Sequence, residues 1–226
     1  MRRTGQAPYR RRPVNSALDR AAMNPRALLI DLDGVVRRWS GDDNSLETSF
    51  ELPQGTIRSI AFDWALVSQA ITGRISDAEW RRRIAIALQE RFPEVRALEA
   101  VEAWSSPHGA VDQATLNVVR WARSQARVAL VTNATSRLGS DLAALGILDE
   151  FDSVINSAEV GAAKPDRAIF LAALRALGVE AASAIFVDDQ QRNVEGAVAM
   201  GMLGHTFSTA EALERSLKAH WGTRAA

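Results

Sequence analysis

The amino-acid sequence predicts an α/β fold, namely a Rossmann-like, doubly wound parallel sheet core with an inserted all-helical cap domain. Short runs that are apolar throughout recur along the chain, as expected of strands buried on both faces of a parallel sheet. Helical patterns lie between these runs, which is typical of βαβ units with right-handed crossovers. After the first run, a stretch of about sixty residues shows no strand pattern, and this stretch predicts the insert.

The expected strands are short and rich in branched apolar side chains, which favour a buried sheet. Four runs are clear and a fifth, at the C-terminal end, is weaker: Ala27–Ile30, Val128–Val131, Val154–Ile155, Ala184–Val187 and Leu203–Phe207.

The helices of the core follow from apolar stripes and from start and stop signals. One of them has Pro165 at a first-turn position and Gly178 just past its end, the expected asymmetry. The expected core helices are Gln113–Gln125, Pro165–Leu177, Asn193–Met200 and Glu211–Trp221.

The insert is predicted to consist of three helices, of which the second opens with a capping box formed by Ser76 and Glu79. Because the insert follows the first strand directly, it lies above the carboxyl edge of the sheet, where open α/β sheets bind ligands, and we expect it to act as a lid. The expected insert helices are Ser59–Ile71, Ser76–Phe92 and Glu94–Trp104. The expected division of the chain is a disordered basic tail (1–26), a catalytic core (27–44 and 108–226) and a helical cap (45–107).

The composition excludes several classes of protein. The 226 residues include no Cys, so there is no disulfide framework, thiol nucleophile or thiolate zinc site. The 27 basic and 27 acidic side chains balance, so no net field attracts nucleic acid or an anionic membrane. No apolar stretch approaches the roughly 18 residues of a membrane span. We therefore expect a cytoplasmic protein whose partner is neither nucleic acid nor a membrane.

Polar side chains follow three of the expected strands, and they converge on one site if the strands are parallel and adjacent. If four carboxylates lie so close together, some of them would become protonated unless a cation balanced their negative charge. Oxygen ligands favour Mg²⁺, and a nearby loop adds a lysine and leaves room for an anion, best interpreted as phosphate. The residues concerned are Asp31, Asp33, Thr132, Asn133, Lys164, Asp188 and Asp189.

Four segments in order resemble the motifs of the haloacid dehalogenase superfamily of aspartate-nucleophile phosphohydrolases. They read LLIDLDGVV (28–36), VALVTN (128–133), GAAKPD (161–166) and FVDDQQRNVEGAVAMGM (186–202), the last in the paired-aspartate variant. The interval between Asn133 and Lys164 is too short for a lid domain, so the resemblance is to the helical-cap subfamily.

The resemblance implies a role for each catalytic residue. Asp31 would be the nucleophile, and Asp33 the general acid and base. Thr132 would hydrogen-bond the phosphoryl oxygens, with the backbone of Asn133 nearby. Lys164 would pair with both the phosphate and Asp31.

The resemblance also implies a magnesium site formed by Asp31, Asp33, Asp188 and Asp189. Asp33 would contribute its backbone carbonyl, and Asp189 would bind the ion or orient its shell. Asn193 matches a supporting position. His108, near the end of the insert, is interpreted as an exposed loop residue without an assigned role.

The function predicted is a Mg²⁺-dependent phosphatase that hydrolyses small phosphorylated metabolites through an aspartyl-phosphate. One alternative is a 2-haloacid dehalogenase-type hydrolase, which attacks carbon and gives Asp33 and the metal acids no purpose. The other is a catalytically silent binding or regulatory module with the same fold. Such proteins usually damage the nucleophile, the lysine or the metal acids, and here all are intact.

Overall fold

The computed structural model of the chain describes residues 25–39 and 43–222. The expectation of a disordered tail over residues 1–26 lies almost wholly outside the described residues. The core is a five-stranded parallel sheet in the order β5-β4-β1-β6-β7, so the first strand along the chain is the central one. The strands are β1 (Ala27–Ile30), β4 (Arg127–Thr132), β5 (Ser153–Asn156), β6 (Ala184–Asp188) and β7 (Leu203–Thr206).

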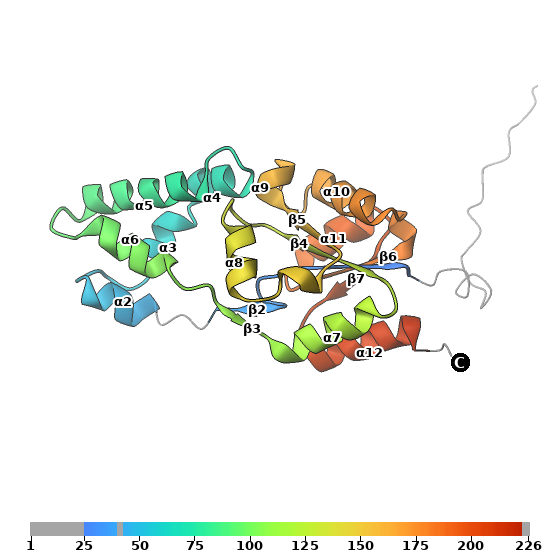
Figure 1. Cartoon of the computed structure of the whole chain (residues 1–226). Helices are drawn as coiled ribbons and strands as arrows, with labels where there is room; N and C mark the ends of the chain where they lie inside the picture. Colours follow the sequence, from blue (N-terminus) through green and yellow to red (C-terminus); the bar gives the residue numbers. More distant parts are fainter. Residues whose placement is uncertain (1–24, 40–42, 223–226) are drawn as a thin grey trace, which may run out of the picture.

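Helices cover both faces of this sheet (Figure 1). On one face lie α7 (Gln113–Arg123), α8 (Leu138–Ala144) and α12 (Ala210–Trp221), and on the other lie α10 (Arg167–Leu177) and α11 (Gln191–Ala199). The central strand contributes side chains to the hydrophobic cores on both faces. Leu28 and Ile30 pack on the face covered by α7, α8 and α12, and Leu29 packs on the face covered by α10 and α11. The predicted α/β, doubly wound core is therefore confirmed.

The register brings the ends of three strands to one edge. Ile30 of β1 pairs with Leu130 of β4 and with Val187 of β6, all in parallel. The residues that follow these three positions therefore lie at the same carboxyl edge of the sheet. The short helix α9 (Ser157–Val160) begins directly after β5 at the same edge.

Five helices form a separate bundle between β1 and α7, which we call the helical segment (residues 43–105). It lies beyond one end of the sheet and has its own hydrophobic core, which includes Ile57, Ile84, Leu88 and Ala100 (Figure 1). Its elements are α2 (Asp43–Ser49), α3 (Thr56–Ala61), α4 (Trp64–Ile71), α5 (Asp77–Arg91) and α6 (Ala97–Ser105).

Several boundaries differ from the sequence prediction. The helix expected over Ser59–Ile71 is two helices, because the side chain of Asp63 accepts a hydrogen bond from the backbone N of Ala65 and so caps a new start. The helix expected to begin at Pro165 begins at Arg167, since Asp166 is its cap and accepts from the backbone N of Ala168. The short elements α2, α8, β2 and β3 were not predicted.

The helical segment joins the core through two antiparallel strands, β2 (Arg37–Arg38) and β3 (Ala110–Val111). It also contacts the core at the loop that follows β4. There Thr135 donates a hydrogen bond from Oγ1 to Oδ1 of Asp77 at 2.7 Å, and the backbone N of Asp77 donates to Oγ of Ser136 at 3.0 Å. The helical segment therefore approaches the carboxyl edge of the sheet.

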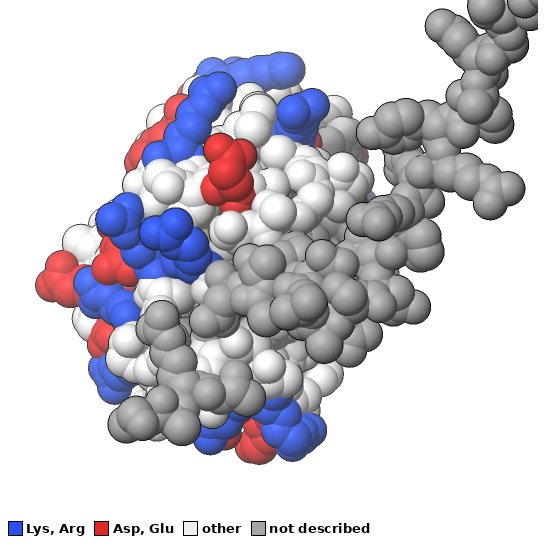
Figure 2. Space-filling model, turned by 90° about the vertical axis from the view of Figure 1, so that its right-hand side faces the viewer, with Lys and Arg blue, Asp and Glu red and all other residues white. Residues whose placement is uncertain are grey.

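The described surface carries charges of both signs. Figure 2 shows Lys and Arg side chains interspersed with Asp and Glu side chains on one face of the molecule. Within residues 25–39 and 43–222, no helix is long and apolar enough to cross a membrane.

Candidate active site

Asp31 lies at the centre of the carboxyl edge, directly after β1. Its backbone N donates to the carbonyl of Val187 in β6 at 2.9 Å, and its Oδ1 accepts from the backbone N of Leu32 at 2.7 Å. The residue is 5% exposed. Strand pairing and the following turn thus fix a buried carboxylate at the point where a ligand would meet the sheet.

Lys164 lies beside Asp31 and is almost fully buried. Its Nζ is 2.6 Å from Oδ1 of Asp31, 2.7 Å from Oδ2 of Asp188 and 2.9 Å from the carbonyl oxygen of Val131. Asn133 holds the lysine's loop, since its Oδ1 accepts from the backbone N of Lys164 at 2.7 Å and its Nδ2 donates to the carbonyl of Lys164 at 3.1 Å. Asn133 contributes its side chain here, which the sequence prediction did not include.

Asp188 ends β6 and is held by the start of α11. Its Oδ1 accepts from the backbone N of Gln190 at 2.8 Å, and Nδ2 of Asn193 reaches its two carboxylate oxygens at 3.0 and 3.1 Å. The contact between Asn193 and Asp188 agrees with the predicted supporting position. Asp188 is therefore fixed in orientation while one carboxylate oxygen also faces Lys164.

Three carboxylates come together at this point. Among the described residues, Asp31, Asp188 and Asp189 can each offer a ligand atom within 4.8 Å of the others. Gly34 makes room for Asp189, because a Cβ added at Gly34 would lie 2.5 Å from Oδ2 of Asp189. We call Asp31, Asp188 and Asp189 the acid cluster.

The electrostatics of the acid cluster favour a bound cation. Burial raises the pKa of Asp31 to about 7, with Lys164 opposing the rise and the charge of Asp188 adding to it. Burial and the charge of Asp188 also raise the pKa of Asp189. Lys164 supplies one positive charge against three carboxylates. A hard divalent cation with oxygen ligands, such as Mg²⁺, fits this donor set.

Asp33 points to a different set of partners. Its Oδ1 accepts from Nε of Arg37 and from Nε1 of Trp39, both at 2.7 Å, and its Oδ2 accepts from Nη2 of Arg37 at 2.9 Å. The carboxylate of Asp33 is not part of the acid cluster. The role predicted for its backbone carbonyl as a magnesium ligand stays a prediction.

Thr132 is the last residue of β4 and is almost fully buried. Its position at the carboxyl edge, in register with Asn156 of β5, is the one that the sequence predicts. A hydrogen bond from Thr132 to a phosphoryl oxygen stays a prediction.

Sequence reasoning missed the surroundings of Asp33. Arg37 also reaches the buried Asp141 of α8, with Nη1 3.3 Å from Oδ2, and Nδ1 of His108 lies 2.8 Å from Oδ1 of the same carboxylate. Arg37 and Asp141 are 104 positions apart, so no local pattern could reveal the contact. His108 is partly exposed, as expected, but it has a specific partner.

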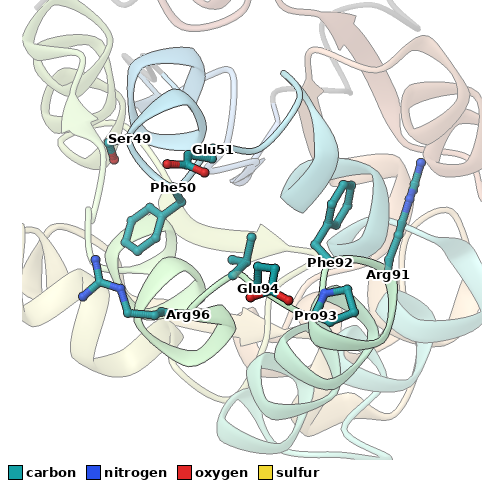
Figure 3. Close-up of a pocket in the computed structure, with 9 residues that line it drawn as sticks. Ser49, Phe50, Glu51, Arg91, Phe92, Pro93, Glu94 and Arg96 are labelled. Atoms are coloured by element: carbon teal, nitrogen blue, oxygen red, sulfur yellow. The ribbon is translucent and has the colours of Figure 1, made fainter.

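A cavity of about 400 Å³ lies elsewhere, in the helical segment (Figure 3). Its walls come from the end of α2 and the two residues after it, which include Phe50, and from the turn between α5 and α6, which includes Phe92. None of its lining residues belongs to the carboxyl edge of the sheet. This cavity is therefore separate from the acid cluster.

The fold and the acid cluster agree with what comparison with known proteins shows. Residues 25–201 match the family model of haloacid dehalogenase-like hydrolases, which covers most of the chain. The chain therefore belongs to the haloacid dehalogenase-like hydrolase family, and it is a hydrolase of that family.

Individual relatives agree with this assignment. "Haloacid dehalogenase-like hydrolase domain-containing protein 3" of Mus musculus is 36% identical over 93 residues, which are 41% of this chain and 37% of that protein. The chain thus matches less than half of that relative's length. "Phosphatase MT3486" of Mycobacterium tuberculosis is 25% identical over 80% of this chain and 86% of that protein. The crystal structure of the HAD family enzyme bt-2542 of Bacteroides thetaiotaomicron, in complex with magnesium and inorganic phosphate, superposes with a TM-score of 0.67 at 22% identity, over 81% of this chain and 94% of that one.

Proposed function

We propose that this protein is a Mg²⁺-dependent phosphatase that hydrolyses phosphomonoesters of small metabolites through an aspartyl-phosphate. The observation that carries the proposal is the contact of Lys164 with both Asp31 and Asp188, beside a second acid, Asp33, two residues from the nucleophile. The name of the mycobacterial relative and the magnesium and phosphate bound by bt-2542 give the proposal further support.

In the first step, the carboxylate of Asp31 attacks phosphorus in line with the leaving oxygen. The new bond joins Asp31 to phosphorus while the bond to the leaving oxygen breaks. Asp33 gives its proton to that oxygen, so the product leaves as a neutral alcohol. Lys164 balances the charge on the phosphoryl oxygens, which Thr132 and the backbone of Asn133 also hold.

In the second step, Asp33 is a carboxylate and accepts a proton from water as the water oxygen attacks phosphorus. The bond between phosphorus and Asp31 breaks, which restores the nucleophile and releases inorganic phosphate. Asp31, Asp188, Asp189 and the carbonyl of Asp33 would hold Mg²⁺, which when bound supplies charge stabilisation and orientation.

The alternative chemistry, hydrolytic dehalogenation, does not use all of these groups. A halide leaves as an anion and requires no proton, so an acid at position 33 would have no task. The substrate would also lack the charged phosphoryl group that a lysine and a divalent cation neutralise. Asp33, Lys164 and the acid cluster together favour the phosphatase.

We propose that residues 45–107 are a cap over a catalytic core formed by residues 27–44 and 108–226. Three contacts support the cap. Thr135 and Ser136 bond to Asp77, and the backbone of Gly73 packs so closely against Ala158 that an added Cβ would lie 2.0 Å from the carbonyl oxygen. A cap in this place would exclude water from the phosphoryl group and would select the small metabolite that carries it.

The test is a panel of small phosphomonoesters and short 2-haloacids, incubated with the protein in Mg²⁺ and in EDTA. We expect inorganic phosphate from the esters, loss of that release in EDTA, and no halide from the haloacids. Release of halide, or phosphate release that persists in EDTA, would contradict the proposal. Folded, Mg²⁺-loaded protein that releases neither product would favour the silent module instead.

A further inference from the structure

Arg37 makes a bidentate contact with the carboxylate of Asp33. Its Nε and Nη2 donate to the two different oxygens of Asp33 at 2.7 and 2.9 Å. Such parallel bonds fix the orientation of a carboxylate as well as its position. The guanidinium also lies 4.5 Å from the ring centre of Trp39, whose Nε1 donates to the same Oδ1. Asp33 is therefore held in one orientation although its side chain is 39% exposed.

The two oxygens of Asp33 are not equivalent. Within residues 25–39 and 43–222, Oδ1 accepts two hydrogen bonds, from Arg37 and Trp39, whereas Oδ2 accepts one, from Arg37. Oδ2 therefore keeps a lone pair for a proton, and Oδ1 serves as the anchor.

Arg37 is itself held from the opposite side. It is 3% exposed, and its Nη1 lies 3.3 Å from Oδ2 of Asp141, which is also buried. Burial alone would lower the pKa of Arg37, but the hydrogen bonds and charges of Asp33 and Asp141 raise it. A charged guanidinium is thus fixed between two carboxylates, one from the turn after β1 and one from α8.

Asp141 has two more partners, which leave it little freedom. Nδ1 of His108 lies 2.8 Å from its Oδ1, and Nε of Arg137 lies 3.0 Å from the same oxygen. Arg137 in turn donates to the carbonyl oxygens of Ser105 and Pro107, where the chain returns from the helical segment. Asp141 thus anchors Arg37 at the junction of α8 with this return connection.

We propose that Asp141, acting through Arg37, is a positioning residue that orients Oδ2 of Asp33 for proton transfer to the leaving oxygen. The inference rests on the proposed phosphatase function. General acid catalysis needs the acid within hydrogen-bond reach of the reacting oxygen, so a small displacement of Asp33 weakens proton transfer. Loss of Asp141 leaves Arg37 with one carboxylate and releases it from α8.

The test compares two esters that differ in their need for a proton. The leaving group of an alkyl phosphate is a poor one, an alkoxide, unless its oxygen is protonated. The leaving group of p-nitrophenyl phosphate is a stable phenolate, which needs no proton. For each ester we would measure kcat/KM, which reports the steps up to formation of the aspartyl-phosphate. In Asp141→Asn, we expect a loss of about tenfold for the alkyl ester and of less than about twofold for the nitrophenyl ester.

Two further variants separate positioning from general damage to the fold. Asp152→Asn changes a carboxylate outside the candidate active site, which pairs with Arg123. This variant should leave kcat/KM for both esters unchanged. The double variant Asp33→Asn, Asp141→Asn should be no slower than Asp33→Asn alone, because Asp141 acts only through Asp33. If Asp141→Asn does not fold, Arg37→Lys carries the same test, since lysine keeps the charge but cannot form the bidentate contact.

Equal losses for the two esters, or additive losses in the double variant, would overturn the inference and leave the phosphatase intact. A wild-type protein that hydrolyses neither ester would overturn the proposed function and this inference with it. The two failures are therefore distinguishable.

Discussion

Nζ of Lys164 lies 2.6 Å from Oδ1 of Asp31, and both side chains are buried at the carboxyl edge of the sheet. The lysine comes from a loop that Asn133 fastens to the end of β4, so its position depends on tertiary structure. Since the same Nζ also contacts Asp188, one ammonium group holds the proposed nucleophile next to a proposed metal ligand. The stability of the acid cluster therefore depends on the positive charge of Lys164 and on the ionisation of Asp31.

Replacement of Lys164 with Met should destabilise the metal-free protein. The buried carboxylates of Asp31 and Asp188 lose their cation, and breaking a buried pair in this way costs about 3–5 kcal/mol. Urea unfolding in EDTA measures the loss, and saturating Mg²⁺ should restore part of it. Lys218→Met is the matched control, because the exposed pair of Lys218 with Glu214 contributes at most about 1 kcal/mol. Equal losses in the two variants would contradict the account.

Magnesium should bind more tightly at pH 8 than at pH 6. Burial raises the pKa of Asp31 to about 7, so in the metal-free protein this carboxyl is mostly protonated at pH 6 and mostly ionised at pH 8. A metal that binds the ionised form must displace the proton, and the affinity falls by up to about tenfold per pH unit below that pKa. The upward shift of Tm caused by Mg²⁺ reports this. Asp188→Asn should weaken the shift at both pH values, and a shift that is independent of pH in the wild type would contradict the prediction.

Gly34→Ala should weaken magnesium binding. Gly34 has φ +81°, and its new Cβ would lie 2.5 Å from Oδ2 of Asp189. Gly146→Ala is the control, because Gly146 also has a positive φ, +67°, but open space around it. Both variants should lose about 1–2 kcal/mol of stability from backbone strain, and only Gly34→Ala should bind Mg²⁺ more weakly in calorimetric titrations. Unchanged affinity in Gly34→Ala would show that Asp189 moves freely.

Gly73→Ala should affect substrate binding if residues 45–107 are a cap. The added Cβ would collide with the carbonyl of Ala158 and displace the helical segment from the core. We expect KM for a phosphomonoester to rise several-fold, because closure over the substrate is impaired. Gly55→Ala, at φ +78° with no atom near its Cβ, serves for comparison and should keep the wild-type KM. Identical KM values in all three proteins would exclude a contribution of this contact to binding.

The sequence predicts the parallel sheet and the positions of its polar ends because both depend on short-range patterns. Asp31 and Asp188 each follow a run of apolar residues. Their proximity then follows from the rule that parallel strands end at one edge of the sheet. Helix boundaries are predicted less well, since capping by Asp63 and Asp166 competes with apolar periodicity and divides or shortens the expected helices.

The environment of Asp33 could not be predicted from the sequence. Arg37 is a charged residue in a region that resembles a solvated turn, and its burial depends on its contacts with Asp33 and with the distant Asp141. The same limit applies to His108, which the sequence suggests is an exposed loop residue. Contacts between distant segments leave no periodic signal in either segment.

The most direct test of the central claim is phosphate release by Asp31→Asn, measured with Mg²⁺ and an ester that the wild-type protein hydrolyses. Asp152→Asn is again the matched carboxylate-to-amide control, and thermal unfolding confirms that both variants are folded. We predict that Asp31→Asn loses at least about 10³-fold in kcat whereas Asp152→Asn retains the wild-type rate. Turnover by Asp31→Asn at a rate similar to the wild type would contradict the assignment of Asp31 as the nucleophile.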